Sequence, residues 1–355
     1  SMDLLNGTRY DQVQIVSAKW DAVQYKPGNA TQPIRIEGEK VLSILRESQL
    51  LQGARHAIES GDAARALKDL TPILAAAKDG DWQKAEAGYL SGKAYRLAND
   101  EKEAVKAFKS FIEKHRAEKD WFLPFATQEL AESQLAARQS GTAELTFKEL
   151  EQYGGQWAWH AKLGAAKAIL ASDQRKAKAM VARGLSDEVA RSREAPSSLK
   201  NQAIVLRGKI FLIQENPQGA IKELTDAFFS AAKQEVDYSV ERAEATLLMG
   251  RAHVALGGKE NLEQAEIWFL RVPALYRRHA AVYAQGCDEL SSLYEKLGNA
   301  TRAAEWKARK QGGQGGRAAA PQVAPGAVSQ PAAVPASPAV PPAKKNGGGS
   351  ARGSK

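Results

Sequence analysis

The chain has 355 residues, of which 43% are hydrophobic, enough for one long solenoid or two ordinary domains. Its formal charge of +9 is uneven: residues 311–355 contribute +5, which leaves +4 for the first 310 residues and gives no indication of nucleic-acid binding. The single cysteine, Cys287, excludes an intrachain disulfide, and no run of 18 apolar residues predicts a membrane span.

Residues 1–48 have the pattern of short β-strands. Asn6-Gly7 is a tight-turn dipeptide, and apolar residues then alternate with polar ones, as at Ile34 and Ile36. Four or five such strands predict a small antiparallel roll or barrel. Because fewer than 50 residues bury little surface on their own, we expect this module to dock on its neighbour or to self-associate.

The remainder divides into a helical region, residues 49–310, and a tail, residues 311–355. The tail holds 7 of the 14 prolines and 9 of the 29 glycines, with almost no large apolar side chain. Such a segment cannot bury enough surface to offset its ordering entropy, so the composition predicts disorder. The Ser1-Met2 start is typical of a trimmed N-terminus, which leaves cytoplasm and envelope open and favours the envelope if a signal peptide was removed.

A repeat frame recurs along the helical region. A small residue is followed twelve positions later by Ala, and four positions after that by a large apolar residue, as two close-packed helices require. The seven instances are Ala54/Ala66/Leu70, Gly92/Ala104/Phe108, Ala131/Ala143/Phe147, Ala165/Ala177/Val181, Gly208/Ala220/Leu224, Gly250/Ala265/Phe269 and Ser291/Ala303/Lys307. The sixth is three residues longer, and the last has Trp306 beside Lys307.

Turn residues fall between the small residue and the Ala in the repeats. Asp62, Asp100 and Asp173 suit helix N-caps, and Asn216 followed by Pro217 suits a cap and a first helical turn. The alternative to a repeat protein is an irregular Ala-rich helical bundle.

The frame resembles the tetratricopeptide repeat (TPR) family. The best single match is Tyr89-Leu90-Ser91-Gly92-Lys93-Ala94-Tyr95 with Ala104, Phe108 and Phe111, and the resemblance covers about residues 50–308. It implies a mainly α fold, a TPR-like right-handed α-solenoid of about seven helix pairs. The β module, long repeats and Pro/Ala tail together also resemble bacterial envelope-associated TPR proteins.

Motifs for chemistry are missing from the sequence. None of the five histidines has a second histidine at metal-ligand spacing, and no HExxH or CxxC motif occurs, so we expect neither an enzyme nor a cofactor. Cys287, among Ala284, Leu290 and Leu293, is interpreted as a packed core thiol. Trp157 and Trp159 are interpreted as core residues, with partner binding as the alternative.

The TPR resemblance implies a scaffold that binds a peptide or protein on the concave face. In this family the residue after the small one faces the groove, which here gives Lys93, Glu132, Ala166, Lys209, Arg251 and Ser292. The cations favour an acidic ligand or a free C-terminal segment. The candidate groove residues are Tyr89, Lys93, Arg96, Val205, Lys209, Leu212, Leu247 and Arg251, with Trp157 and Trp159 as secondary candidates. The alternative function is a structural or assembly subunit that forms a homo-oligomer through the β module.

Overall fold

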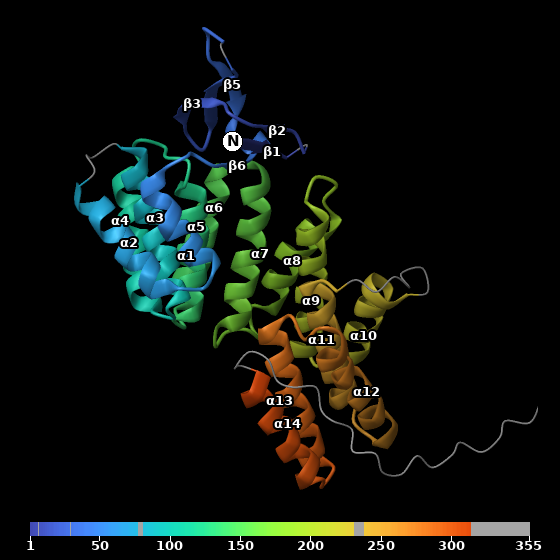
Figure 1. The fold of residues 1–355 in the computed structure, drawn as a ribbon. Coiled ribbons are helices and arrows are strands. Elements are labelled where there is room, and N and C mark those ends of the chain that lie inside the picture. Colours follow the sequence, from blue (N-terminus) through green and yellow to red (C-terminus); the bar gives the residue numbers. More distant parts are fainter. Residues whose placement is uncertain (6, 29, 77–80, 231–237, 314–355) are drawn as a thin grey trace, which may run out of the picture. The chain divides into compact units, whose positions relative to one another are not determined.

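The computed structural model describes residues 1–313, except for residues 6, 29, 77–80 and 231–237 (Figure 1). The expected β module is present as two three-stranded antiparallel sheets, in the strand orders β2-β1-β6 and β3-β4-β5. The strands are β1 (Met2–Leu4), β2 (Arg9–Tyr10), β3 (Gln14–Ala18), β4 (Ala22–Lys26), β5 (Ile34–Glu37) and β6 (Val41–Ile44).

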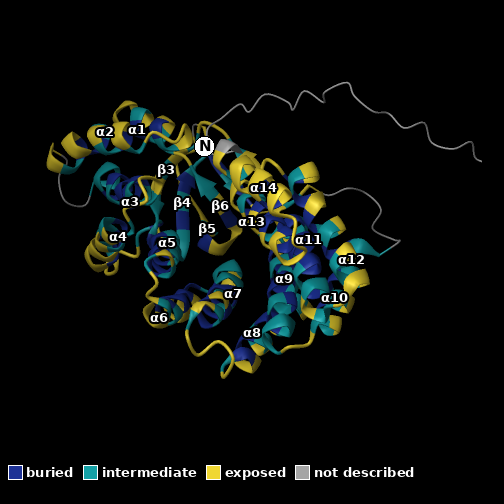
Figure 2. Cartoon of the chain, turned by 90° about the horizontal axis from the view of Figure 1, so that it is seen from below, coloured by how far each residue is buried: buried dark blue, intermediate teal, exposed yellow. Residues whose placement is uncertain are grey.

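Fourteen α-helices follow within the described residues. They are α1 (Gln49–Glu59), α2 (Ala63–Ala76), α3 (Trp82–Leu97), α4 (Glu101–His115), α5 (Leu123–Ala136), α6 (Ser140–Leu150), α7 (Gly155–Ala171), α8 (Ala179–Arg191), α9 (Ser197–Ile213), α10 (Pro217–Leu224), α11 (Val240–Leu256), α12 (Lys259–Leu275), α13 (Ala280–Lys296) and α14 (Ala300–Gly313). Each helix contacts the next one in sequence, and buried residues lie where helices face one another (Figure 2). The predicted TPR-like solenoid of seven helix pairs is thereby confirmed.

The β module docks on the connection between α4 and α5. Its core, with Val23 and Tyr25, also includes Trp121. The Trp20 amide donates to the Lys119 carbonyl oxygen at 3.0 Å, and Lys119 Nζ lies 2.8 Å from Asp21 Oδ2. The module therefore shares its core with the helices, as its small size led us to expect.

The repeat frame describes the helix crossings of most pairs. A Cβ atom added to Gly92 would lie 2.4 Å from the ring of Phe108, and one added to Gly250 would lie 2.3 Å from the ring of Phe269. In the last pair, Ser291 Oγ donates to the Ala303 carbonyl oxygen at 3.0 Å, and Trp306 is buried there. The crossings are thus close because the first helix carries a small residue.

Three of the four predicted N-caps are confirmed. Asp62, Asp100 and Asn216 accept hydrogen bonds from the backbone amides three residues further on, at 3.0, 3.2 and 2.9 Å. These bonds satisfy amides that the first helical turn leaves without partners.

The fourth instance of the frame is wrong. Ala177 lies exposed in a turn, Val181 is 56% exposed, and Asp173 caps no helix because α8 begins only at Ala179. The fully buried small residues of α8 are Ala182 and Ser186. The turn between α7 and α8 is longer than the frame assumed, which shifts the second helix.

At the C-terminal end, α14 extends to Gly313, three residues into the predicted tail. The rest of that tail, residues 314–355, lies outside the described residues, and the domain limits stay predictions. Among the described helices, none is both long and apolar enough to cross a membrane.

Candidate functional site

The candidate site lies on the surface formed by the first helix of each pair, here called the first-helix wall: α1, α3, α5, α7, α9, α11 and α13. Each of these helices contacts the next one in the series. Each also carries a buried small residue, namely Ala54, Gly92, Ala131, Ala166, Gly208, Gly250 and Ser291. In α7 the following residue, Lys167, is exposed, so the frame fits this helix when it starts from Ala166 and not from Ala165.

A regular set of contacts between side chains, here called the ladder, joins successive first helices. In each first helix, the residue directly after the buried small residue makes the contact. Its partner lies on the next first helix, six positions before the small residue of that helix. Four steps follow this rule: Arg55 Nη2 to Glu86 Oε1 at 2.5 Å, Lys167 Nζ to Gln202 Oε1 at 3.2 Å, Lys209 Nζ to Glu244 Oε2 at 2.9 Å and Arg251 Nη2 to Gln285 Oε1 at 3.4 Å. The cation always lies in the earlier repeat.

Further ion pairs strengthen the ladder. Arg96 of α3 pairs with Glu129 and, at 3.1 Å, with Glu132 of α5. Arg251 Nε also lies 2.7 Å from Glu289 Oε1. Arg96, Lys209 and Arg251, which the sequence predicts as groove cations, are thus already paired with carboxylates of the wall, and a ligand carboxylate has to compete with these partners.

The ladder is interrupted at its second and third steps: at Lys93 on α3, and at Glu132 on α5, whose counterpart on α7 is His160. Six positions before Ala131 the chain has Phe125, an aromatic residue that cannot neutralise the ammonium group.

Lys93 Nζ lies 5.8 Å from the centre of the Tyr89 ring, and within the described part of the chain it forms no ion pair. Burial lowers the pKa of Lys93, the neighbouring Arg96 lowers it further, and the Glu59 carboxylate acts in the opposite direction. Lys93 is therefore a half-buried cation that forms no ion pair within the described residues.

Aromatic side chains surround this interruption. Tyr89 stacks on Phe122 at 4.9 Å between ring centres, and Phe125 meets Trp157 edge-on at 4.7 Å. His160 follows, 5.7 Å from Trp157. Apart from Tyr89, which is buried, these side chains are half-buried. We call Phe122, Phe125, Trp157 and His160 the aromatic segment; it spans α5, the residue before it, and α7.

The charges beside the aromatic segment are partly desolvated. Burial lowers the pKa of His160, Lys167 lowers it further, and Glu132 acts in the opposite direction. Burial also lowers the pKa of Lys167, although its side chain reaches solvent. An anion bound here would stabilise the charged forms of both groups.

The other predicted residues lie deeper. Tyr89, Val205 and Leu247 are 7, 2 and 3% exposed, and burial raises the pKa of Tyr89. Leu212 is half-buried against the cluster of Val205. Trp159 is also half-buried, with the Lys162 ammonium 5.4 Å from its ring. Tyr89, Val205 and Leu247 therefore support the wall from behind and offer little surface to a ligand.

Sequence reasoning missed Phe125, His160 and Lys167. The signal for Phe125 and His160 is their place six positions before a small residue, which becomes meaningful once adjacent first helices are known to touch there. The frame assigns the small position of α7 to Ala165, one residue before Ala166, and therefore does not mark Lys167 as a groove residue.

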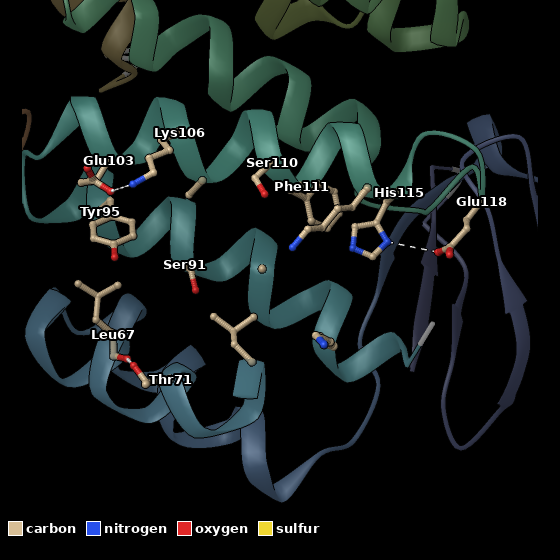
Figure 3. A pocket seen from close by; sticks show the side chains of 15 residues that line it. Leu67, Thr71, Ser91, Tyr95, Glu103, Lys106, Ser110, Phe111, His115 and Glu118 are labelled. Carbon is tan, nitrogen blue, oxygen red and sulfur yellow. Dashed lines mark hydrogen bonds and ion pairs between the residues drawn. The ribbon is translucent and has the colours of Figure 1, made fainter. Parts of the chain in front are cut away.

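A separate hollow of about 700 Å³ lies between α2, α3 and α4 (Figure 3). Ser91 and Tyr95 of α3 point into it, but the Ser91 hydroxyl donates to the Ala87 carbonyl oxygen of its own helix. Within the lining, Glu103 forms an ion pair with Lys106 at 3.4 Å, and His115 Nδ1 lies 3.3 Å from Glu118 Oε2. Lys84 and Lys114 also line the hollow, so its lysines outnumber its carboxylates.

The expected core thiol is confirmed. Cys287 is fully buried in the cluster of Leu290 and Leu293, and burial raises the pKa of its thiol. A thiol with a raised pKa is a poor nucleophile at neutral pH. In the part of the chain that the structure describes, no group of three or more His, Cys, Asp and Glu side chains could hold a metal ion.

The ladder predicts energetic coupling between repeats. We expect Lys209→Ala and Glu244→Ala to show a coupling free energy of about 0.5–1 kcal/mol in a double-mutant cycle, because the pair is only half-buried. Urea unfolding of the four proteins measures it. The coupling should shrink in high salt, and a value of zero in low salt would show that the contact adds nothing to the wall.

A solved structure with a TM-score above 0.5 supports the fold. A tetratricopeptide repeat protein from Parabacteroides merdae is similar over 74% of this chain and 91% of its own, with a TM-score of 0.57 and 11% identity. The apo form of the quorum sensor NprR from B. thuringiensis is similar over 75% of this chain and 86% of its own, with a TM-score of 0.48 and 12% identity. No protein-family model and no curated protein matches the chain.

Proposed function

We propose that this chain is a non-enzymatic scaffold that binds a peptide or protein partner on its first-helix wall, at Lys93 and the aromatic segment. The observation that carries the proposal is the interruption of the ladder. Elsewhere on the wall, cations after the small residue contact carboxylates or amides, whereas Lys93 faces an aromatic position. A half-buried ammonium group that forms no ion pair favours an anionic ligand.

The ligand that fits this surface is a peptide with a carboxylate, supplied either by an acidic residue or by its own C-terminus, next to an apolar or aromatic side chain. The carboxylate would pair with Lys93, and the neighbouring side chain would pack on Phe125 and Trp157. Aromatic rings give large contact area at low entropic cost, which is why they often dominate binding energy.

The C-terminal half of the wall belongs to the proposed surface as a secondary part. Lys209, Leu212 and Arg251 lie there, but a ligand carboxylate would have to displace Glu244 or Glu289. Exchange of one carboxylate for another gains little free energy. We therefore place the main anchor at Lys93 and a weaker, extended contact at these residues.

The test is a screen of the full-length protein against peptides with free or amidated C-termini and with acidic or neutral sequences. Lys93→Glu should weaken the best binder at least tenfold and reduce the dependence of its affinity on salt. Phe125→Ala should weaken it to a similar extent with unchanged salt dependence, because it removes only apolar contact.

The matched control is Lys109→Glu, which reverses an exposed lysine on α4, the second helix of the same pair. It changes the net charge equally but lies away from the first-helix wall. If Lys109→Glu weakens binding as much as Lys93→Glu, the effect comes from overall charge, and the proposed site is wrong.

A further inference from the structure

Strand β5 forms a free edge of the β module. It is the last strand of the sheet β3-β4-β5, pairs with β4 alone among the described strands, and consists of Ile34, Arg35, Ile36 and Glu37. Three of these four residues are exposed, and Figure 1 shows β5 near the top of the module with the helices below. An edge strand presents unpaired peptide groups that can bond to another strand.

The two faces of β5 differ in character. Ile34 and Ile36 lie opposite Tyr25 and Val23 of β4, which are buried, so the isoleucines belong to the core side of the sheet. Ile34 is nevertheless 47% exposed. Arg35 and Glu37 lie on the outer side. The edge therefore combines uncovered apolar surface on one face with one positive and one negative side chain on the other.

The sequence of β5 is complementary to itself in an antiparallel arrangement. In an antiparallel pair of strands, two residues that lie opposite each other either both point their N–H and C=O groups toward the other strand or both point them away from it. Because these directions alternate along a strand, an odd-numbered residue can only lie opposite an odd-numbered residue of a second copy.

Three registers that satisfy this condition are centred on Arg35, Glu37 and Ile36; those centred on Arg35 and Ile36 pair three residues of β5 with the second copy, and the one centred on Glu37 pairs only Glu37. One places Arg35 opposite the partner's Arg35, and another places Glu37 opposite the partner's Glu37; like charges directly opposite are destabilising. The third places Ile36 opposite the partner's Ile36, and each Arg35 opposite the partner's Glu37. Only the third joins opposite charges, and it does so twice.

We propose that two copies of this protein associate through β5 in this third register, which joins their β3-β4-β5 sheets into one antiparallel six-stranded sheet. We choose a second copy as the partner of this edge because Arg35 and Glu37 of one copy lie opposite Glu37 and Arg35 of the other. Glu37 already lies 2.8 Å from Lys40 of the same molecule, but this pair is exposed and leaves Glu37 accessible to a second cation. Since the strand has four residues, the dimer is weak and forms at high protein concentration.

The experiment is sedimentation velocity of the full-length protein over a wide concentration range. The wild type should form dimers at high concentration. Arg35→Glu and Glu37→Arg should each weaken dimerisation about tenfold or more, because each turns both opposite-charge pairs into like-charge pairs. An equimolar mixture of the two variants should dimerise again, because one protomer then offers two acidic side chains and the other two basic ones.

The double variant Arg35→Glu/Glu37→Arg should also recover the dimer, and Arg35→Lys should retain it. Thermal unfolding confirms that the variants fold, which we expect because both side chains lie on the outer face. The proposal is overturned if the wild-type protein stays monomeric at every concentration. It is then equally wrong if β5 pairs with a strand of another protein instead of a second copy. A dimer that ignores both reversals, or a mixture that fails to recover, overturns the register.

Discussion

Leucine in place of Gly92 is expected to lower the free energy of unfolding by about 3 kcal/mol or more, measured by urea denaturation. A Cβ atom at this position would lie 2.4 Å from Cε1 of Phe108, whose side chain is fully buried between α3 and α4. Because Phe108 is enclosed in this crossing, we expect the two helices to move apart to admit the leucine.

Two further variants make this expectation specific. Gly184→Leu, in the middle of α8, has no neighbouring atom within 4 Å of the added Cβ, so it should gain about 1 kcal/mol from helix propensity alone. Gly208→Leu should be less harmful than Gly92→Leu, because the nearest atom there, Leu224 Cδ2, is 3.0 Å away at the end of a flexible side chain. Equal stabilities of all three variants would show that helix contact distance does not govern these positions.

Removal of Arg55 is expected to cost about 3–5 kcal/mol at neutral pH, because it leaves the buried carboxylate of Glu86 without its main partner. Arg55 Nε donates to Glu86 Oε1 at 2.7 Å, and Arg55 Nη1 donates to the Arg46 carbonyl oxygen at 2.9 Å. The Glu86 side chain is 8% exposed. Urea denaturation of Arg55→Ala measures the loss, and Arg55→Met/Glu86→Leu should regain much of it by replacing both charges.

The loss should also depend on pH. Burial raises the pKa of Glu86 even with Arg55 present, and without Arg55 that pKa rises further. A carboxyl whose folded-state pKa lies above its unfolded value is penalised when it is charged, and the penalty disappears as the pH falls through the folded-state pKa. The stability difference between wild type and Arg55→Ala should therefore shrink on acidification. A difference that stays constant would contradict the burial of an unpaired Glu86.

Much of the helical architecture could be predicted because close crossings leave a mark in the sequence. Gly92 with Phe108, and Gly250 with Phe269, are pairs whose spacing within one repeat is enough to infer contact. In the last pair the frame reaches Lys307, and the neighbouring Trp306 is the residue that is buried there. Local spacing suffices where a helix, a short turn and a second helix follow directly.

The same reasoning failed where the turn was long. Between Ala171 and Ala179 the backbone forms an extended turn, and a fixed spacing of twelve residues ends on the exposed Ala177. Small residues are frequent in α7, so residue type alone does not distinguish Ala165 from Ala166 as the small residue of the repeat frame. Successive residues of an α-helix point about 100° apart, so a frame shifted by one residue assigns the groove position to Ala166 instead of Lys167.

The candidate site was harder to predict because its properties depend on contacts between repeats. Lys93, Lys209 and Arg251 occupy the same position in the frame, yet Lys209 and Arg251 face Glu244, Gln285 and Glu289 while Lys93 faces Phe125. That difference is set by residues about 35 positions further along the sequence. Val205 and Leu247 satisfied the hydrophobic pattern but lie buried between helices.

The fixed six-residue offset of the ladder also determines which segments could be lost during evolution. Loss of one whole repeat from the second half, such as α9 with α10, would bring Lys167 opposite Glu244 and create a new ion pair. Loss of α3 with α4 would instead bring Arg55 opposite Phe125 and leave an arginine without its carboxylate. The charges of the ladder are thus compatible with loss of α9 and α10, whereas loss of α3 and α4, which carry Lys93 of the proposed binding site, would remove the Arg55–Glu86 ion pair.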